Sequence, residues 1–363
     1  MKFKFGEFTT DVHIRGEIPV VENIITLANN KPLIVCDENT SFIADKICNG
    51  NIFPRCVLKS GEENKNWQAV ESILAAANEA FLGRDGIFIG IGGGVIGDLC
   101  GFAASIYKRG CRLVLVPTTL LAMVDASVGG KTGFDLFGIK NLAGSFYPAQ
   151  TVYMPIASLS SLPQREWKSG IGELIKTAIL DNDSFIDMLS EIKKQITETK
   201  DFSKLPECDL LGKCIERAVL VKGRIVSSDP KELGKKRALL NLGHSFAHAL
   251  ESSCGLGNIS HGEAVAWGIA RSCELGIALG VTPQSRAFKI RELIETFGYC
   301  CACPHPITPD TESFFAALKR DKKNKQGKLT FVVPGKKSAL LAALETDEDL
   351  NILMKIIKGD FNF

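Results

Sequence analysis

The stretch Ile87-Phe-Ile-Gly-Ile-Gly92-Gly-Gly-Val-Ile-Gly97-Asp98 gives the clearest indication of the fold. Its first five residues form an apolar run that is typical of a buried strand, and a helical pattern follows over residues 95–107. Glycines at positions 92, 94 and 97 have the spacing Gly-x-Gly-x-x-Gly, which lets the backbone approach a pyrophosphate at a helix N-terminus. A tight turn without a ligand is the alternative, because this spacing alone is a weak motif.

On either side of this stretch, short apolar runs alternate with helical patterns from Lys31 to about Pro155. The alternation predicts an α/β N-terminal domain with a largely parallel, Rossmann-like sheet. After residue 162 the segments become longer and amphipathic, which predicts a mainly α-helical C-terminal domain with one late strand at residues 329–333. We therefore predict an α/β domain over residues 1–162 and a helical domain over residues 163–363.

An acidic residue that binds the ribose of a dinucleotide is expected about 20 residues beyond such a glycine turn, after the next strand. Here that strand ends in Pro117-Thr118-Thr119. Asp37, at the end of an earlier apolar run, is the available substitute. The glycine turn and Asp37 together predict a nucleotide site.

The composition is that of a globular protein whose partners are small molecules. The chain has 43 basic and 41 acidic residues and a formal charge of +2, so the whole molecule has no electrostatic attraction to nucleic acid or to a membrane. No run approaches the ~18 apolar residues of a membrane span, and the first residues lack the apolar core of a signal peptide. We expect no nucleic-acid partner, no membrane association and a cytoplasmic location.

The twelve cysteines are scattered, and many lie in apolar segments, as buried free thiols do. This distribution favours a reducing cytoplasm over a disulfide framework. Cys300, Cys301, Cys303 and His305 are close enough in sequence to be considered as zinc ligands. No second cysteine pair follows at zinc-finger spacing and neighbouring prolines indicate a loop, so a structural role is the favoured interpretation.

Three of the five histidines lie between Asn241 and Glu263, which makes this the strongest candidate for a metal site. His244 and His248 are four residues apart and share one helical face, although either could be a core or network residue instead. Ser260 and Glu263 form a capping box, which places His261 in the first turn of a helix. The positive end of that helix is expected to keep the imidazole of His261 neutral and able to bind a metal.

The carboxylate partner of these histidines is not determined by spacing. Glu263 has a capping role and is a poor candidate. Glu251 follows His248 on the same helical face, and Glu173 lies in the segment Gly172-Glu173-Leu-Ile-Lys176. Both remain open at this point.

Candidate anion-binding features follow the glycine turn in the sequence. The segment Asp125-Ala-Ser-Val-Gly-Gly-Lys131-Thr132 is similar to the end of a nucleoside-triphosphate loop, but Asp125 occupies the position of a required glycine, which disfavours an ATPase. The two glycines beside Lys131, with Lys140-Asn141 nearby, still predict an anion site. Further cations that adjoin motifs or polar turns are Arg109, Lys222, Arg237 and Lys322, for which a solvated surface position is the alternative.

Taken in order, several of these blocks resemble the 3-dehydroquinate synthase family, which is part of the sugar-phosphate cyclase superfamily. The blocks are residues 92–98, Arg109-Gly110, residues 117–121, residues 124–132 and residues 241–244. Their order and spacing make the resemblance specific, and it extends from about Asp37 to Lys323. One departure is Gly138, which lies one position earlier than the glycine of the family's Gly-Lys-Asn.

The resemblance implies a metal site, an NAD site and a substrate site. Zinc or cobalt would be bound by Glu173, His244 and His261. NAD would contact Asp37, Asn39, Ser60, Gly61, Glu62, Lys65, Gly93, Gly94, Val95, Ile96, Gly97, Asp98, Thr118, Thr119, Asp125, Lys131, Lys140, Ser158, Leu159, Ser160 and Ser161. Substrate would contact Arg109, Asp125, Lys131, Asn141, Lys176, Lys222, Arg237, Asn241, His248 and Lys322, with Lys323 as the alternative to the last.

The resemblance also implies the reaction and the assembly. The substrate would be 3-deoxy-D-arabino-heptulosonate 7-phosphate, whose carboxylate and phosphate explain why many cations accompany a redox cofactor. NAD would take a hydride from C5 and return it, phosphate would leave by β-elimination, and an intramolecular aldol step would give 3-dehydroquinate. The family further implies a homodimer.

Three other functions are compatible with parts of the sequence. Another sugar-phosphate cyclase would act on sedoheptulose 7-phosphate or glucose 6-phosphate, which lack a carboxylate, whereas Lys222, Arg237 and Asn241 favour a substrate that has one. A metal-dependent polyol dehydrogenase would need no phosphate site and would make NADH stoichiometrically. A nucleotide-binding sensor without catalysis is disfavoured because the candidate ligands are all present.

Overall fold

The computed structural model describes residues 1–25, 32–199, 202–254, 258–302, 311–320 and 329–359. The chain forms two compact units, which are described separately. Unit 1 comprises Met1–Pro163 and Asp201–Lys231, and unit 2 comprises Gln164–Lys200 and Glu232–Phe363. The first boundary lies one residue from the predicted division after residue 162. The segment Asp201–Lys231, which the sequence placed in the helical domain, packs with unit 1.

Unit 1 is built on a seven-stranded sheet with the strand order β1-β2-β9-β6-β5-β3-β4. The strands are β1 (Lys2–Phe5), β2 (Phe8–Arg15), β3 (Pro32–Asp37), β4 (Arg55–Leu58), β5 (Ile87–Gly92), β6 (Arg112–Pro117) and β9 (Thr151–Pro155). All neighbours pair in parallel except β1 and β2, which are antiparallel. The prediction of a largely parallel sheet is confirmed, and the central strands β3 and β5 are buried on both faces, as their continuous apolar sequences require.

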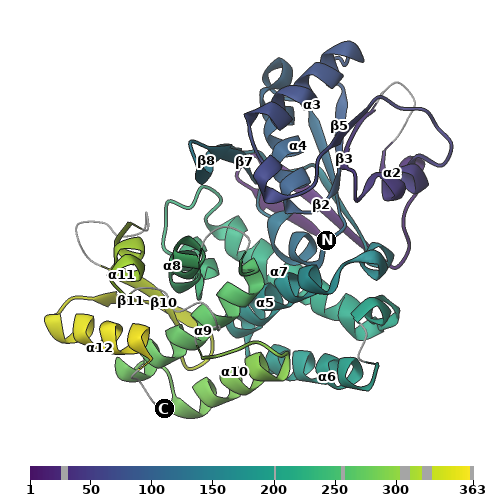
Figure 1. The fold of residues 1–363 in the computed structure, drawn as a ribbon. Helices are drawn as coiled ribbons and strands as arrows, with labels where there is room; N and C mark the ends of the chain where they lie inside the picture. Colours follow the sequence, from purple (N-terminus) through teal and green to yellow (C-terminus); the bar gives the residue numbers. More distant parts are fainter. Residues whose placement is uncertain (26–31, 200–201, 255–257, 303–310, 321–328, 360–363) are drawn as a thin grey trace. The chain divides into compact units, whose positions relative to one another are not determined.

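Helices cover both faces of this sheet (Figure 1). The helices and helical turns of unit 1 are α1 (Val21–Ile24), α2 (Ser41–Cys48), η1 (Glu62–Asn64), α3 (Trp67–Glu79), α4 (Gly94–Ile106), η2 (Tyr107–Arg109), η3 (Ala122–Ala126), η4 (Ile156–Ser161), η5 (Phe202–Glu207) and α7 (Asp209–Ser228). On one face, Ile43 and Ile47 of α2 pack against apolar residues of β3, β5 and β6. On the other face, α4 lies so close to β5 that a Cβ on Gly90 would be 3.1 Å from Cys100.

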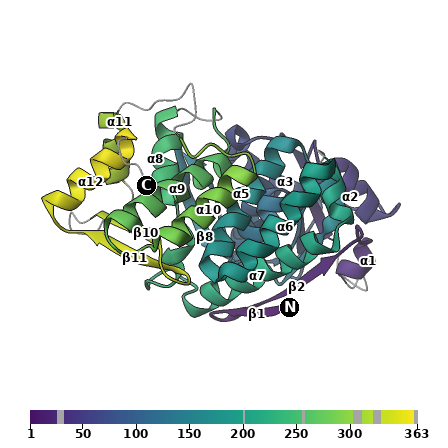
Figure 2. The same cartoon turned by 90° about the horizontal axis from the view of Figure 1, so that it is seen from below.

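Helix α7 lies beside the β1 edge of the sheet (Figure 2). A Cβ on Gly223 of α7 would overlap the ring of Phe3 on β1, so glycine permits this close packing. This contact explains why a segment from the second half of the chain belongs to unit 1.

A two-stranded antiparallel ribbon packs on α4 within unit 1. It consists of β7 (Lys131–Leu136) and β8 (Ile139–Phe146), and the ring of Phe134 lies 5.2 Å from that of Phe102 on α4. The turn between the strands contains Phe137 and Gly138, both with positive φ, which is the geometry of a type I′ hairpin turn. The early position of Gly138 therefore serves this turn.

Unit 2 is mainly helical, as predicted. Its elements are α5 (Gln164–Asp181), α6 (Asp183–Thr199), η6 (Arg237–Asn241), α8 (His244–Cys254), α9 (His261–Ala278), α10 (Gln284–Thr296), α11 (Thr311–Arg320), β10 (Leu329–Pro334), β11 (Ala339–Leu344) and α12 (Asp347–Lys358). The nearly continuous burial of α9 follows from its position against α5, α8 and α10 (Figure 2). The predicted late strand is β10, and β11, which was not predicted, pairs with it in an antiparallel hairpin.

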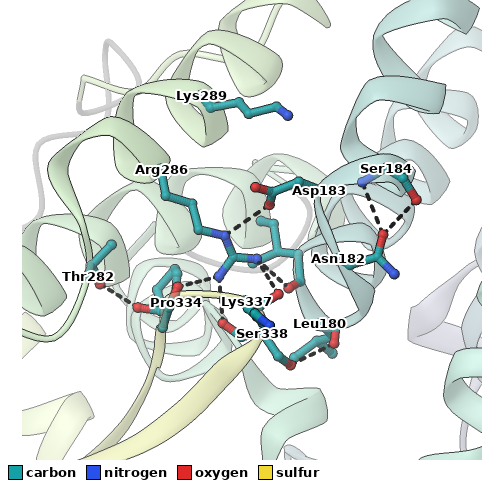
Figure 3. A network of polar contacts seen from close by, with 12 residues as sticks. Leu180, Asn182, Asp183, Ser184, Thr282, Arg286, Lys289, Pro334, Lys337 and Ser338 are labelled. Carbon is teal, nitrogen blue, oxygen red and sulfur yellow. Dashed lines mark hydrogen bonds and ion pairs between the residues drawn. The ribbon is translucent and has the colours of Figure 1, made fainter.

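Arg286 on α10 fixes the β10–β11 turn to the end of α5 (Figure 3). Its guanidinium donates to the carbonyl oxygens of Ser338 at 2.7 Å, Lys337 at 2.9 Å and Ile179 at 3.1 Å, and its Nε lies 3.1 Å from Oδ1 of Asp183. Only arginine offers five N–H donors in one plane, which suits this buried set of acceptors. The last turn of α5 is thereby held in place.

Two features bear on the predicted environment of the chain. Within the described residues, no helix is both long and apolar enough to span a bilayer. The eleven described cysteines are free thiols, and most are buried. Cys303 and His305 of the candidate zinc cluster lie outside the described residues.

Candidate active site

Most of the predicted NAD-binding residues of unit 1 follow the carboxyl ends of its parallel strands. Asp37 ends β3, residues 60–62 follow β4, residues 93–98 follow β5, Thr118 and Thr119 follow β6, and the η4 turn follows β9. Parallel strands have their carboxyl ends at one edge of the sheet, which is where open α/β sheets bind ligands. The topology therefore brings residues from five separate segments to one edge.

The N-terminus of α4 has the features of a phosphate site. Gly93 is the N-cap residue of α4. Because glycine has no side chain, it cannot accept a hydrogen bond from the backbone N–H groups of the first turn. A Cβ on Gly94 would meet only Ala126, at 3.4 Å, which leaves the backbone accessible. A small pocket beside it is lined by Gly92, Gly93, Gly94, Pro117 and Ala126, among others. Backbone amides and the helix dipole at this position favour an anion.

Lys65, Asp98 and Asn141 meet next to this helix. The Nζ of Lys65 lies 2.6 Å from Oδ2 of Asp98 and donates to Oδ1 of Asn141 at 2.6 Å. Burial opposes the charge of Lys65, but Asp98 and Glu62 outweigh it and raise its pKa, so the ammonium stays charged. Asn141 has φ of 51° and is held by a hydrogen bond from its backbone N–H to Asp135.

Asp125 and Lys222 form a second polar pair within unit 1. The Nζ of Lys222 lies 2.7 Å from Oδ1 of Asp125 and also donates to the backbone carbonyl of that residue. Lys222 is buried and lies on α7, which packs on η3. The return of residues 201–231 to unit 1 is what brings these two predicted substrate contacts together.

The other predicted residues of unit 1 take more varied positions. The side chain of Asp37 accepts from the backbone N–H and the hydroxyl of Thr40. Arg109 is exposed and has φ of 68°, in the turn that ends at Gly110. Leu159 belongs to the core, so only its backbone is available for a ligand. The hydroxyls of Ser158, Ser160 and Ser161 donate to carbonyl oxygens of their own turn. The hydroxyl of Ser60 donates to the carboxylate of Glu38. Lys131 and Lys140 are exposed on the β7–β8 ribbon.

Unit 2 brings Glu173, His244 and His261 together from three helices. Their potential ligand atoms all lie within 4.8 Å of one another. Oε1 of Glu173 is 3.5 Å from Nε2 of His244 and 3.2 Å from Nε2 of His261. One carboxylate and two imidazoles form a donor set that binds zinc in catalytic sites, where a further position remains open. The residues therefore fit a divalent metal.

Two glycines set the distance between α5 and α9. A Cβ on Gly172 would lie 2.5 Å from the carbonyl oxygen of Gly262, and a Cβ on Gly262 would lie 2.3 Å from that of Ser169. Real Cβ atoms do not approach backbone so closely, so this crossing requires glycine at both positions. Glu173 and His261 adjoin these glycines, and the crossing brings them together.

Gly243 has the corresponding role for His244. Its φ is 78°, and a Cβ there would lie 2.9 Å from the carbonyl oxygen of Val265 on α9. On the facing side, a Cβ on Gly268 would lie 2.1 Å from the carbonyl oxygen of Gly243. Because α8 begins this close to α9, its first residue, His244, reaches the other two candidate ligands.

The two candidate histidine ligands differ in protonation. Burial and the charge of Lys176 hold the pKa of His244 well below its usual range. Burial also opposes charge on His261, but hydrogen bonds to Glu173 and Glu251 outweigh it and raise its pKa to about 10. Without a metal, these two carboxylates therefore outweigh the helix N-terminus, which was expected to keep His261 neutral. A metal at this site competes with that proton.

Other predicted residues of unit 2 lie near this cluster in sequence or in space. Lys176, one turn after Glu173, is buried and forms an ion pair with it. His248 is exposed, and its ring lies 5.5 Å from that of His244. Arg237 is buried in η6, which ends at Asn241, three residues before the first residue of α8. Lys322 and Lys323 lie outside the described residues.

The structure adds one residue whose role the sequence left open. Glu251 lies on α8, and its Oε1 is 3.2 Å from Nδ1 of His261. The signal in the sequence is its spacing: Glu251 follows His244 by two helical turns and so lies on the same face. The spacing does not say which histidine it contacts, because that depends on how α9 packs.

Solved structures of known proteins share the fold of this chain. The chain is similar to ValA, a 2-epi-5-epi-valiolone synthase from Streptomyces hygroscopicus subsp. jinggangensis 5008 with NAD+ and Zn2+ bound, with a TM-score of 0.84 and 23% identity over 98% of this chain and 99% of the other. It is also similar to 2-deoxy-scyllo-inosose synthase complexed with carbaglucose-6-phosphate, NAD+ and Co2+, with a TM-score of 0.81 and 24% identity over 99% of each chain. The chain therefore shares the fold of these two synthases.

Sequence comparison defines the family. Residues 55–169 match the 3-dehydroquinate synthase N-terminal model, and residues 170–324 match the 3-dehydroquinate synthase C-terminal model. A 3-dehydroquinate synthase from Prochlorococcus marinus (strain MIT 9313) is 42% identical over 77% of this chain and 72% of the relative, and one from Campylobacter curvus (strain 525.92) is 38% identical over 89% and 86%. The chain belongs to the 3-dehydroquinate synthase family.

Proposed function

We propose that this chain converts 3-deoxy-D-arabino-heptulosonate 7-phosphate into 3-dehydroquinate and phosphate, as a carbon–oxygen lyase that uses NAD catalytically and a divalent metal. The meeting of Glu173, His244 and His261 is the observation that supports this most directly. Family membership supports the choice of substrate, because the relatives named above are 3-dehydroquinate synthases.

Two bound groups would supply the chemistry that amino acids lack. When bound, NAD supplies reversible hydride transfer and zinc or cobalt supplies Lewis acidity toward the substrate's hydroxyls. Glu173, His244 and His261 would hold the metal. The carboxyl edge of the unit 1 sheet, with Asp37, would hold NAD, in keeping with the NAD+ named for the two structures of similar fold.

Cationic side chains have the remaining proposed roles. Lys176 and Lys222 are both buried, which strengthens their attraction to an anion because the surrounding dielectric is low. Asp125 holds the ammonium of Lys222 in place. A substrate with a carboxylate and a phosphate calls for cations of this kind, for which Arg237 of unit 2 is a further candidate, and a buried cation would stabilise the charge on the departing phosphate.

The first experiment measures products. The purified protein, loaded with zinc or cobalt, is incubated with 3-deoxy-D-arabino-heptulosonate 7-phosphate and NAD at about one hundredth of the substrate concentration. We expect phosphate release to run to completion with no net NADH, and a carbocycle with the mass of 3-dehydroquinate. Stoichiometric NADH would instead identify a polyol dehydrogenase. Turnover of sedoheptulose 7-phosphate or glucose 6-phosphate in its place would identify a different cyclase.

Assembly and location are part of the same proposal. We infer a homodimer from the family resemblance, and a cytoplasmic location from the free and mostly buried cysteines. Light scattering of the purified protein tests the first, because a monomeric mass at micromolar concentration would contradict it. Fractionation of the source cells tests the second.

A further inference from the structure

We propose that Glu251 is a positioning residue for the metal centre: its carboxylate accepts a hydrogen bond from Nδ1 of His261 and holds Nε2 of that ring toward Glu173. This inference rests on the proposed function only in requiring that Glu173, His244 and His261 bind a metal. The sequence offered Glu251 only as a possible metal ligand and gave no residue an orienting role.

The geometry of the His261 ring supports the assignment. Oε1 of Glu251 lies 3.2 Å from Nδ1, and Oε1 of Glu173 lies 3.2 Å from Nε2. The two ring nitrogens of an imidazole point away from each other, so the two carboxylates occupy opposite sides of the ring. A carboxylate on Nδ1 fixes the proton there and leaves the lone pair of Nε2 for a metal.

The same geometry decides between the two roles that Glu251 could have. As a metal ligand, Glu251 would need a carboxylate oxygen next to Glu173 and His244. Among the described residues, the cluster of potential ligand atoms contains Glu173, His244 and His261 and does not contain Glu251. Glu251 therefore contacts the cluster through the His261 ring.

The helices explain why Glu251 can reach this ring. Glu251 lies on α8, two turns after His244, and α8 packs along α9, which His261 opens. His244 is a direct candidate ligand and Glu251 lies on the same face of its helix, so one face of α8 supplies both a ligand and an orienting group. The side chain of His261 is 32% exposed, against 1% for Glu173, so His261 is the candidate ligand with the most freedom to turn without such a partner.

The energetic consequence is a loss of metal affinity when the partner is removed. A carboxylate that accepts from the remote N–H of a ligand histidine fixes the ring and makes the ligating nitrogen more basic, and its loss typically weakens metal binding about 10- to 100-fold. Glutamine keeps the acceptor oxygen and loses the charge, so Glu251→Gln should lose less affinity than Glu251→Ala.

The test is a metal titration of three variants. Apo forms of the wild-type protein, Glu251→Ala, Glu251→Gln and the control Glu274→Gln are titrated with zinc and with cobalt against a competing chelator. Glu274 is also a buried glutamate of unit 2, but it pairs with Arg271 away from this cluster. We expect about 10- to 100-fold weaker binding for Glu251→Ala, a smaller loss for Glu251→Gln and no change for the control. The visible absorption of bound cobalt should change in both Glu251 variants, which a general loss of stability would not cause.

Three results would overturn the proposal. Wild-type affinity and an unchanged cobalt spectrum in both Glu251 variants would remove Glu251 from the centre while leaving the metal site intact. Complete loss of binding in Glu251→Ala, as severe as in Glu173→Ala, would make Glu251 a ligand. Failure of the wild-type protein to bind zinc or cobalt would overturn the proposed metal centre and this role with it.

Discussion

Glu274 shows how a buried carboxylate is tolerated in unit 2 without any part in the proposed chemistry. It lies on α9 with only 3% of its surface exposed, and its Oε1 is 2.7 Å from Nη2 of Arg271. Burial raises the pKa of Glu274 from its ordinary value near 4.5 to about 7, and the charge of Arg271 offsets only part of this effect. A buried ion pair of this kind costs desolvation energy that its attraction does not fully return.

This raised pKa predicts a pH dependence of stability. The folded state binds the proton of Glu274 more tightly than the unfolded state, so its contribution is complete below about pH 4.5 and is lost as the pH rises through about 7. The shift corresponds to about 3 kcal/mol in the free energy of unfolding. The free energy of unfolding, measured with urea, should therefore decline less between pH 5 and pH 8 in Glu274→Gln than in the wild-type protein. Parallel curves for the two proteins would contradict the shift, and the comparison cancels the groups that both proteins share.

At the scale of elements, the crossing of α5 and α9 determines whether the candidate ligands meet. Gly172→Ala places a methyl group against the backbone of Gly262, and neither helix can move without shifting Glu173 or His261. We expect a loss of about 1–3 kcal/mol in the free energy of unfolding from overpacking, together with weaker zinc binding. Urea unfolding and zinc titration measure the two effects.

Gly212→Ala is the matched control for this prediction. Gly212 lies inside α7, and its added Cβ would meet only the end of the Ile156 side chain, at 3.2 Å, which can move. Alanine is favoured over glycine in a helix by about 0.5–1 kcal/mol, so this variant should be neutral or more stable and should bind zinc normally. Equal losses in both variants would show that the α5–α9 crossing has no special role.

The elements that the sequence predicted correctly are those whose apolar residues follow a clear strand or helix pattern. The apolar run that begins at Ile87 located β5, the helical pattern over residues 95–107 located α4, and the late apolar run located β10, each to within a few residues. Helix α5 was not predicted because its residues from Ser169 to Leu180 are buried on every side, so it has no polar face. Strand β8 was not predicted because its residues are largely exposed, and its turn at Phe137-Gly138 sets its pairing.

The candidate site also has features that the sequence predicted and features that it could not predict. Local spacing was sufficient to place His244 and His248 on one helical face and His261 in the first turn after the Ser260–Glu263 capping box, which the structure contains. Spacing could not choose between Glu173 and Glu251, because the choice depends on helix packing across long stretches of chain. The protonation of His261 was missed for the same reason, since both carboxylates that determine it come from other helices.

For the whole molecule, the important fact is that the chain passes between the two units more than once. It leaves unit 1 after Pro163, returns at Asp201 and leaves again after Lys231. The return supplies Lys222, which pairs with Asp125, so unit 1 is not complete in the first 163 residues. The residues proposed for NAD all belong to unit 1, whereas the proposed metal ligands all belong to unit 2.

This division predicts that the two cofactors can be lost separately while the reaction needs both. Asp37→Ala should weaken NAD binding about 10- to 100-fold, because a carboxylate that accepts from ribose hydroxyls contributes about 1.5–3 kcal/mol, and zinc binding should not change. His261→Ala should lose the metal and keep NAD affinity, as measured by calorimetry on each variant. Both variants should release little phosphate from 3-deoxy-D-arabino-heptulosonate 7-phosphate. Full phosphate release by His261→Ala without metal would contradict the proposed reaction, because no other described cluster of this chain offers a comparable set of metal ligands.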